Sequence, residues 1–310
     1  MEEVETMSET LVQTVRLTRR YGTQTVVDGL DLKVKRGEVY GFLGPNGAGK
    51  TTTIRMLLGL ICPTSGEIEM FGQPLAKNRI QILRRVGALV ESPSYYGHLT
   101  GRENLEVTRR LLGAPKRRID EVLDRVRLRQ AADKKVKQYS LGMKQRLGIA
   151  SALLGEPDLL ILDEPTNGLD PAGIQEVREF IVELPRLQDV SVLVSSHLLS
   201  EVEQMATQVG IIQQGKLIFQ GPIAELRKQS RPRVRFGVGD PAEAQRLLRE
   251  QGWQVSREEG DLWIEGLNRE ATSRVVENLV MDRFSVYRVE EVKPSLEELF
   301  LGLTGKGESL

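Results

Sequence analysis

The sequence lacks a second cysteine, an excess of either charge, and a long apolar run. A single cysteine, Cys62, excludes an internal disulfide and fits a reducing compartment, and its apolar neighbours predict a small core residue. Lysine plus arginine number 43 and aspartate plus glutamate also 43, which is unlike the basic balance of nucleic-acid-binding proteins. No stretch approaches a membrane span, and the acidic start has no signal-peptide pattern. We therefore expect a soluble, cytoplasmic chain with a disordered tail at residues 1–9.

What the chain does contain is enough apolar sequence for two domains. It has 310 residues, 40% hydrophobic and 28% charged, without internal repeats. A change in pattern near Ser230-Arg231-Pro232 divides a larger domain, residues 10–229, from a smaller one, residues 230–310. The smaller domain shows strand, helix, two strands, helix and strand, which predicts a small α+β sandwich. It shows no catalytic group, so we expect a structural or regulatory role.

The most informative motif is a glycine-rich run that fits G-x-x-x-x-G-K-[ST]. It lies between an apolar segment, residues 38–43, typical of a buried strand, and residues 51–60, typical of a helix. Such a loop wraps the phosphates of a nucleotide with backbone amides at a helix N-terminus, while its lysine contacts the β- and γ-phosphates and its hydroxyl ligates Mg²⁺. The predicted nucleotide-binding residues are Gly44, Pro45, Asn46, Gly47, Ala48, Gly49, Lys50, Thr51 and Thr52.

Buried strands separated by helices predict a largely parallel sheet. Residues 86–90, 159–162 and 190–194 are short apolar runs of this kind, whereas residues 10–18 and 30–34 alternate as half-buried strands do. Helical spacing in residues 102–112 and 118–126 predicts a helical subdomain at about 91–157. Ser140 is placed to cap the helix that follows it.

Two acidic residues follow the strand at 159–162, and a histidine follows the strand at 190–194. At the carboxyl edge of a parallel sheet, Asp163 would hold Mg²⁺ and Glu164 would polarise the attacking water. Solvated acids at a strand end are the alternative. His197 can donate to the γ-phosphate, although a lone histidine is usually structural. Tyr21 can stack on the base, or be an ordinary strand aromatic.

These motifs, together with Tyr139-Ser140-Leu141-Gly142-Met143, give the chain a specific resemblance. It resembles the nucleotide-binding subunits of ATP-binding cassette (ABC) transporters over roughly residues 11–225, with the signature usually written LSGGQ at 139–143. The resemblance implies a P-loop α/β ATPase core with an antiparallel β flank and a helical subdomain. It also implies a head-to-tail homodimer, in which each ATP lies between one phosphate loop and Ser140, Leu141, Gly142 and Met143 of the second copy. Asp170 would couple the two sites across the interface.

The chain departs from the family pattern at two positions. Leu141 replaces a common glycine, which should leave Ser140 and Gly142 able to contact phosphate. Glu91 replaces a glutamine whose carbonyl usually meets Mg²⁺ and whose loop meets the membrane partner. A carboxylate binds the metal more strongly but repels the γ-phosphate until metal is present. We therefore predict an unusually strong Mg²⁺ dependence of ATP binding.

Residues 91–105 resemble the branch that exports bacitracin and lantibiotics, and Pro294-Ser295-Leu296-Glu297-Glu298-Leu299-Phe300 is similar to daunorubicin-type export ATPases. The resemblance implies an ATPase at the inner face of the membrane, bound to a separate six-helix permease. Tyr95 and Tyr96 can dock a cytosolic helix of that permease, or simply pack. The rival hypotheses are a soluble ABC ATPase acting on ribosomes or nucleic acid, which usually has two cassettes per chain, and a non-hydrolysing sensor.

Overall fold

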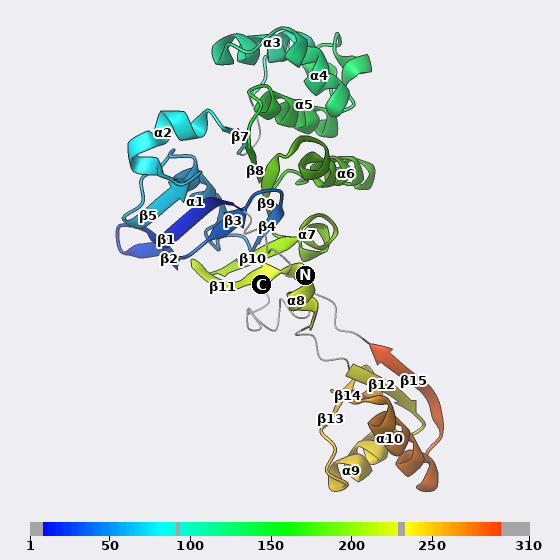
Figure 1. Ribbon diagram of the computed structural model, residues 1–310. Helices are drawn as coiled ribbons and strands as arrows, with labels where there is room; N and C mark the ends of the chain where they lie inside the picture. Colours follow the sequence, from blue (N-terminus) through cyan, green and yellow to red (C-terminus); the bar gives the residue numbers. More distant parts are fainter. Residues whose placement is uncertain (1–8, 91–93, 229–232, 293–310) are drawn as a thin grey trace, which may run out of the picture. The chain divides into compact units, whose positions relative to one another are not determined.

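The computed structural model describes residues 9–90, 94–228 and 233–292 of the chain (Figure 1). Contacts divide the chain into two compact units, and the division falls between Ile223 and Ala224. The boundary predicted from the sequence lies six residues later, at 229/230. The helix α8 (Ile223–Lys228) begins at the division. The two units are described separately below as the N-terminal and the C-terminal unit.

A six-stranded sheet forms the centre of the N-terminal unit, with the strand order β11-β10-β4-β9-β8-β7. All its neighbours are parallel except β10 and β11, so the predicted, largely parallel sheet is confirmed. Every residue of β4, β8 and β9 is buried, which explains their uninterrupted apolar runs. The strands are β4 (Val39–Leu43), β7 (Val86–Leu89), β8 (Leu159–Asp163), β9 (Ser191–Ser196), β10 (Gln208–Gln213) and β11 (Lys216–Pro222).

The second sheet of this unit is antiparallel and is the expected β flank. Its order is β2-β1-β5-β6, and β3 pairs separately with β1. The strand predicted over residues 30–34 is in fact interrupted, because the Thr14 hydroxyl donates to Leu30 O (2.7 Å) and accepts from Leu32 N (2.8 Å) where ladder bonds would continue. The strands are β1 (Thr10–Tyr21), β2 (Gln24–Leu30), β3 (Lys33–Lys35), β5 (Ser65–Met70) and β6 (Gln73–Pro74).

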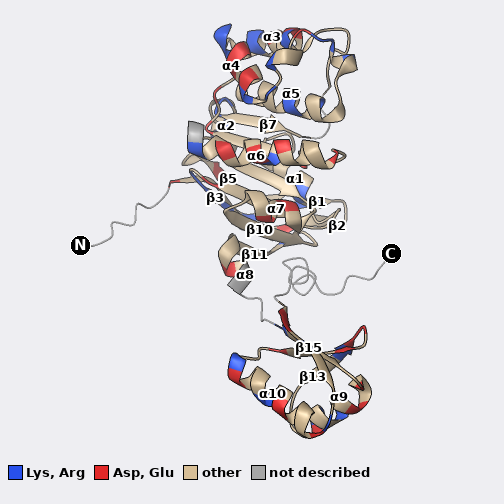
Figure 2. Cartoon of the chain, turned by 90° about the vertical axis from the view of Figure 1, so that its right-hand side faces the viewer, with Lys and Arg blue, Asp and Glu red and all other residues tan. Residues whose placement is uncertain are grey.

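The helices of the N-terminal unit fall into groups that Figure 1 shows plainly. The helical subdomain, α3, α4 and α5, lies together at one end, and α6 and α7 lie on one side of the six-stranded sheet. Figure 2 shows acidic and basic residues interspersed over α3 and α4. The helices are α1 (Lys50–Leu57), α2 (Leu75–Leu83), α3 (Gly101–Leu112), α4 (Arg117–Arg125), α5 (Leu141–Leu153), α6 (Pro171–Gln188) and α7 (Leu199–Met205), with short 3₁₀ turns at Arg129–Ala131 and Val136–Gln138.

The end of α1 corrects one prediction. The helix expected to reach residue 60 ends at Leu57, and Leu60 beyond it is 60% exposed. Cys62 follows in the same loop and is exposed, so it is not the small core residue that its apolar neighbours suggested. No helix in the described part of the chain combines the length and the apolar character that crossing a membrane requires.

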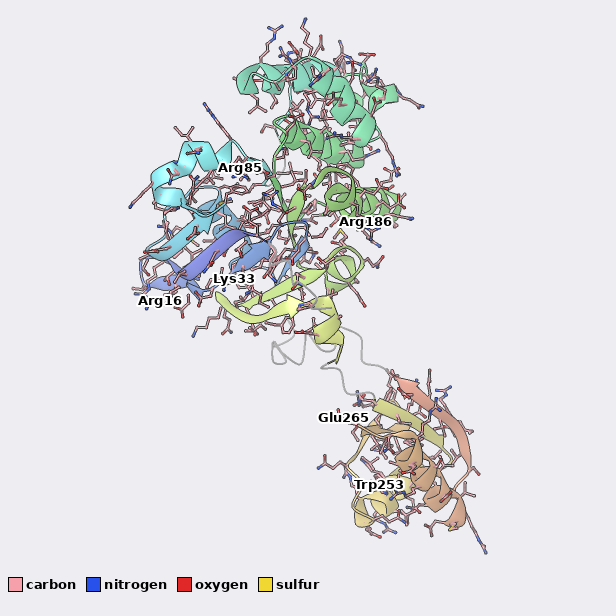
Figure 3. All side chains as sticks on the ribbon, in the orientation of Figure 1. Arg16, Lys33, Arg85, Arg186, Trp253 and Glu265 are labelled. Atoms are coloured by element: carbon pink, nitrogen blue, oxygen red, sulfur yellow. The ribbon has the colours of Figure 1, made fainter. Side chains whose placement is uncertain are left out.

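The C-terminal unit is a four-stranded antiparallel sheet of order β13-β14-β12-β15 with two helices. Its own core includes Phe236, Leu248, Leu262 and Leu279, all fully buried. Both tryptophans of the chain lie here, and Trp253 is labelled in Figure 3. The elements are β12 (Arg233–Val238), α9 (Pro241–Glu250), β13 (Val255–Glu258), β14 (Asp261–Glu265), α10 (Arg269–Met281) and β15 (Val286–Val292).

Candidate active site

The glycine-rich run forms a tight loop between β4 and α1. Gly47 and Gly49 have φ angles of 80° and 109°, which side-chain-bearing residues rarely adopt. A Cβ on Gly44 would lie 2.3 Å from Ile212 O, and a Cβ on Gly49 would lie 2.8 Å from Val26 O. Only glycine therefore fits at these positions, and Pro45, Asn46 and Gly47 form an exposed tip.

Neighbouring elements hold the loop in place. Gly215 N, from the turn between β10 and β11, donates to Ala48 O (3.0 Å), and Gly215 O accepts from Asp28 N (2.9 Å). Tyr21 lies on the β1–β2 hairpin, whose second strand contributes the Val26 carbonyl. Tyr21 is 47% exposed, and the Arg19 guanidinium lies 4.5 Å from the centroid of its ring.

The first turn of α1 carries the chemistry of the loop. Lys50 is 5% exposed, and its ammonium donates to Gly44 O (2.7 Å) and Pro45 O (3.3 Å). Its Nζ also lies 3.2 Å from Glu164 Oε1, at the end of β8. Thr51 and Thr52 are partly exposed in this turn, where backbone amides have no partner within the helix. The lysine thus joins the phosphate loop to the acidic edge of the sheet.

The two predicted acids and the histidine lie at adjacent strand ends. Glu164 Oε2 lies 2.8 Å from His197 Nδ1, and Glu164 has a left-handed φ of 48°. Strain of this kind persists where the surroundings enforce it and is common at active sites. Asp163 is 7% exposed. The structure thus brings together Lys50, Asp163, Glu164 and His197 from three different elements.

Four polar residues that the sequence did not single out hold these loops. The Ser195 hydroxyl donates to Asp163 Oδ1 (2.5 Å) and accepts from Glu164 N (2.9 Å). Glu201 Oε2 accepts from Thr166 Oγ1 (2.7 Å) and Ser196 Oγ (3.0 Å). The signal available in the sequence was only their position, within four residues of the acids or the histidine.

The signature segment begins α5, as expected from the cap. Ser140 is exposed, and its hydroxyl accepts from Met143 N (3.2 Å), so the serine also has a role within its own chain. Leu141 is 52% exposed, and its Cδ2 would lie 3.2 Å from a Cβ on Gly168. Asp170 caps α6 by accepting from Gly173 N (3.0 Å). The signature segment at the start of α5 and the loop that leads to Asp170 at the start of α6 are therefore neighbours within one chain.

A cavity of about 330 Å³ lies between β7, α3 and α5 and is bordered by Tyr95 and Tyr96. Burial raises the pKa of the Tyr95 hydroxyl above its usual range, and this hydroxyl donates to Lys144 O (2.5 Å). Tyr96 is 55% exposed, and His98 makes an edge contact with its ring. Glu91, predicted to ligate Mg²⁺, lies outside the described residues.

Two described protein families match parts of the chain. Residues 27–167 match the family described as "ABC transporter", and residues 221–304 match "ATP-binding protein DrrA1-3-like, C-terminal domain". The chain is 46% identical to the bacitracin transport ATP-binding protein BcrA of Bacillus licheniformis, covering 96% of this chain and 98% of that protein. It is 36% identical to the daunorubicin resistance ATP-binding protein DrrA3 of Streptomyces coeruleorubidus, covering 96% and 97%.

A solved structure, "Structure of ATP binding subunit of ABC transporter", matches with a TM-score of 0.63 at 32% identity, covering 71% of this chain and 93% of that one. Fold and site together define a P-loop ATPase. The chain belongs to the ABC transporter family of ATP-binding proteins, which bind ATP and hydrolyse it to power transport. The predicted family, fold class and enzymatic activity are confirmed, and the rival ATPase acting on ribosomes or nucleic acid is not favoured.

Proposed function

We propose that this chain is the ATP-hydrolysing subunit of an exporter and works as a head-to-tail homodimer beneath a separate six-helix permease. The observation that carries the proposal is the line of contacts from Lys50 Nζ to Glu164 (3.2 Å) and from Glu164 to His197 (2.8 Å). It starts in the phosphate loop and ends beside the position that an attacking water would take.

In this proposal each residue of the line has a defined role. Lys50 binds the β- and γ-phosphates, which draws its ammonium away from Glu164. The released carboxylate accepts a hydrogen bond from the attacking water and orients it. His197 holds the other oxygen of Glu164 and donates to the γ-phosphate, so it senses whether that phosphate is attached.

The donors near the loop fit Mg²⁺. Among the described residues, no group of three or more histidine, cysteine or acidic side chains could hold a metal by itself. Mg²⁺ is usually held by one or two protein oxygens together with substrate phosphates and water. Thr51 and Asp163, with Glu91, would hold it, and the ion would neutralise phosphate charge. The Ser195 hydroxyl donates to Asp163 Oδ1, which orients this carboxylate.

The incomplete enclosure of the phosphate loop supports the proposed dimer. Its tip, Pro45 to Gly47, is exposed, and so is Ser140 at the start of α5. A helix N-terminus without an acidic residue in its first turn attracts phosphate. Ser140 and Gly142 of a second copy would complete the γ-phosphate site, and Asp170 would lie at the interface.

The permease is proposed to dock at the cavity between β7, α3 and α5. Tyr95 is tied to α5 by its hydroxyl, whereas the exposed ring of Tyr96 is free to pack against a cytosolic helix of the partner. This docking would hold the chain at the inner face of the membrane. The relatives named for bacitracin and daunorubicin suggest an antibiotic, peptide or lipid-like cargo.

The decisive experiment replaces Glu164 with glutamine. The variant should bind ATP as before but lose at least about 100-fold in kcat, because an amide is a poor proton acceptor. The matched control is Glu259→Gln, since Glu259 also has a left-handed φ (51°) and lies in the C-terminal unit. Near-normal hydrolysis by Glu164→Gln would contradict the mechanism. The docking is tested by purifying the chain from solubilised membranes. A permease should be recovered together with the wild-type chain, and less of it with Tyr96→Ala.

A further inference from the structure

Glu201 is a buried carboxylate to which the proposed mechanism gives no task. It lies in α7 and is 7% exposed. The hydroxyls that it binds are buried as well, with Thr166 4% and Ser196 2% exposed. Burying a charge is unfavourable unless hydrogen bonds replace its hydration, so its position calls for an explanation.

The two hydroxyls belong to the two loops that carry the proposed catalytic pair. Thr166 lies two residues after Glu164, and Ser196 lies immediately before His197. Both donate to the same oxygen, Oε2 of Glu201, at 2.7 Å and 3.0 Å. One carboxylate oxygen therefore joins the loop after β8 to the end of β9.

Helix α7, which carries Glu201, is firmly packed. Leu199, Val202 and Met205 of α7 are at most 4% exposed, which fixes the helix against its neighbours. The loop that Thr166 anchors is itself a chain of turns, because Asn167 N donates to Glu164 O (3.2 Å) and Leu169 N donates to Thr166 O (3.2 Å). A hydroxyl can rotate freely, and a fixed acceptor is what gives it one orientation.

We propose that Glu201 is a positioning residue that sets the distance between Glu164 and His197. It holds both loops in the arrangement in which His197 Nδ1 lies 2.8 Å from Glu164 Oε2. This inference rests on the proposed roles of Glu164 and His197 in hydrolysis. Loss of the Glu201 carboxylate lets the two loops move apart, while Lys50 and the backbone amides that bind the phosphates remain in place.

The test compares ATP hydrolysis and ATP binding in three variants. Glu201→Ala should lower kcat about 10- to 100-fold, the effect of a displacement of about 1 Å at a reacting group, with ATP affinity unchanged. Glu201→Gln keeps an oxygen that accepts from both hydroxyls and should restore most of kcat. The control Glu183→Ala removes an exposed carboxylate from the adjacent helix α6 and should match wild type. Normal kcat in Glu201→Ala, or equal losses in Glu201→Ala and Glu201→Gln, would overturn the proposal.

A purely structural role is separated by combining Glu201→Ala with His197→Ala. If Glu201 acts through the pair, the double variant is no slower than His197→Ala alone, whereas independent effects multiply. Should Glu201→Ala not fold, Thr166→Val against Thr166→Ser asks the same question: only valine should lower kcat. Activity in Glu164→Gln would refute the proposed function itself. Loss there with normal Glu201 and Thr166 variants would refute only this inference.

Discussion

Replacing Ser195 with alanine should destabilise the N-terminal unit by about 3 kcal/mol. The Ser195 side chain is fully buried and makes two hydrogen bonds, to the Asp163 carboxylate (2.5 Å) and from Glu164 N (2.9 Å). A hydrogen bond to a charged group contributes about 2 kcal/mol, and a buried amide left without its partner costs about 1 kcal/mol. Because both partners belong to the site, kcat should fall together with stability.

The matched control is Ser191→Ala, in the same strand. Ser191 is equally buried, but within the described part of the chain its hydroxyl makes one hydrogen bond, accepting from Gly37 N (2.8 Å), so the expected loss is about 1 kcal/mol, with normal kcat. For a unit of this size the Ser195 variant should melt about 6–12 °C lower than wild type. Circular dichroism follows the unfolding of the whole chain, while tryptophan fluorescence reports only the C-terminal unit. Equal stabilities and equal kcat in the two variants would refute the reasoning.

Three further predictions concern the loop, the acid limb of stability and the metal. Gly49→Ala should weaken binding of a fluorescent ATP analogue at least tenfold, because Gly49 has a φ of 109° and a Cβ there would meet a carbonyl oxygen. The control Gly29→Ala should bind normally, because a Cβ on Gly29, which has a φ of 61°, meets no neighbouring atom. Equal binding by the two variants would contradict this prediction. The hydrogen bond from Arg85 lowers the pKa of Asp158, so the ionised carboxylate stabilises the folded chain fully above about pH 4, and this stabilisation is lost as the pH falls through the folded pKa. The difference in unfolding free energy between wild type and Asp158→Asn, measured in urea, should therefore shrink on acidification. A difference that stays constant with pH would contradict this prediction. Glu91→Gln should make ATP binding less dependent on Mg²⁺. If a Mg²⁺ titration of ATP binding gives the same curve for Glu91→Gln and wild type, Glu91 does not have the predicted effect.

The features predictable from the sequence are those set by local patterns. The residue types of Gly44 to Thr51 are enough to identify the loop, and Ser140 needs only the following turn to act as a cap. The buried strand ending at Asp163 is evident from an uninterrupted apolar run. In each case the physical cause lies within about ten residues of sequence.

What the sequence could not reveal depends on distant contacts. Glu201 and Thr166 are 35 residues apart, and nothing in an isolated α7 indicates that a glutamate there would be buried. The interruption after Leu30 depends on the side chain of Thr14, which pairing of strands alone brings near. The exposure of Cys62 depends on where α1 ends, and helix ends are weakly encoded by apolar pattern.

The end of β9 has a consequence for how this chain can vary. Consecutive strand residues face opposite sides, so the Ser195 hydroxyl donates to Asp163 while the Ser196 hydroxyl donates to Glu201. In the observed register Ser195 stands opposite Asp163. A deletion of one residue in this strand would put Ser196 in the place of Ser195 and His197 in the place of Ser196, which removes the contact with Glu201 and displaces the histidine from Glu164. Length in β9 is therefore a stricter requirement than composition, and natural or engineered variation there should be confined to substitutions.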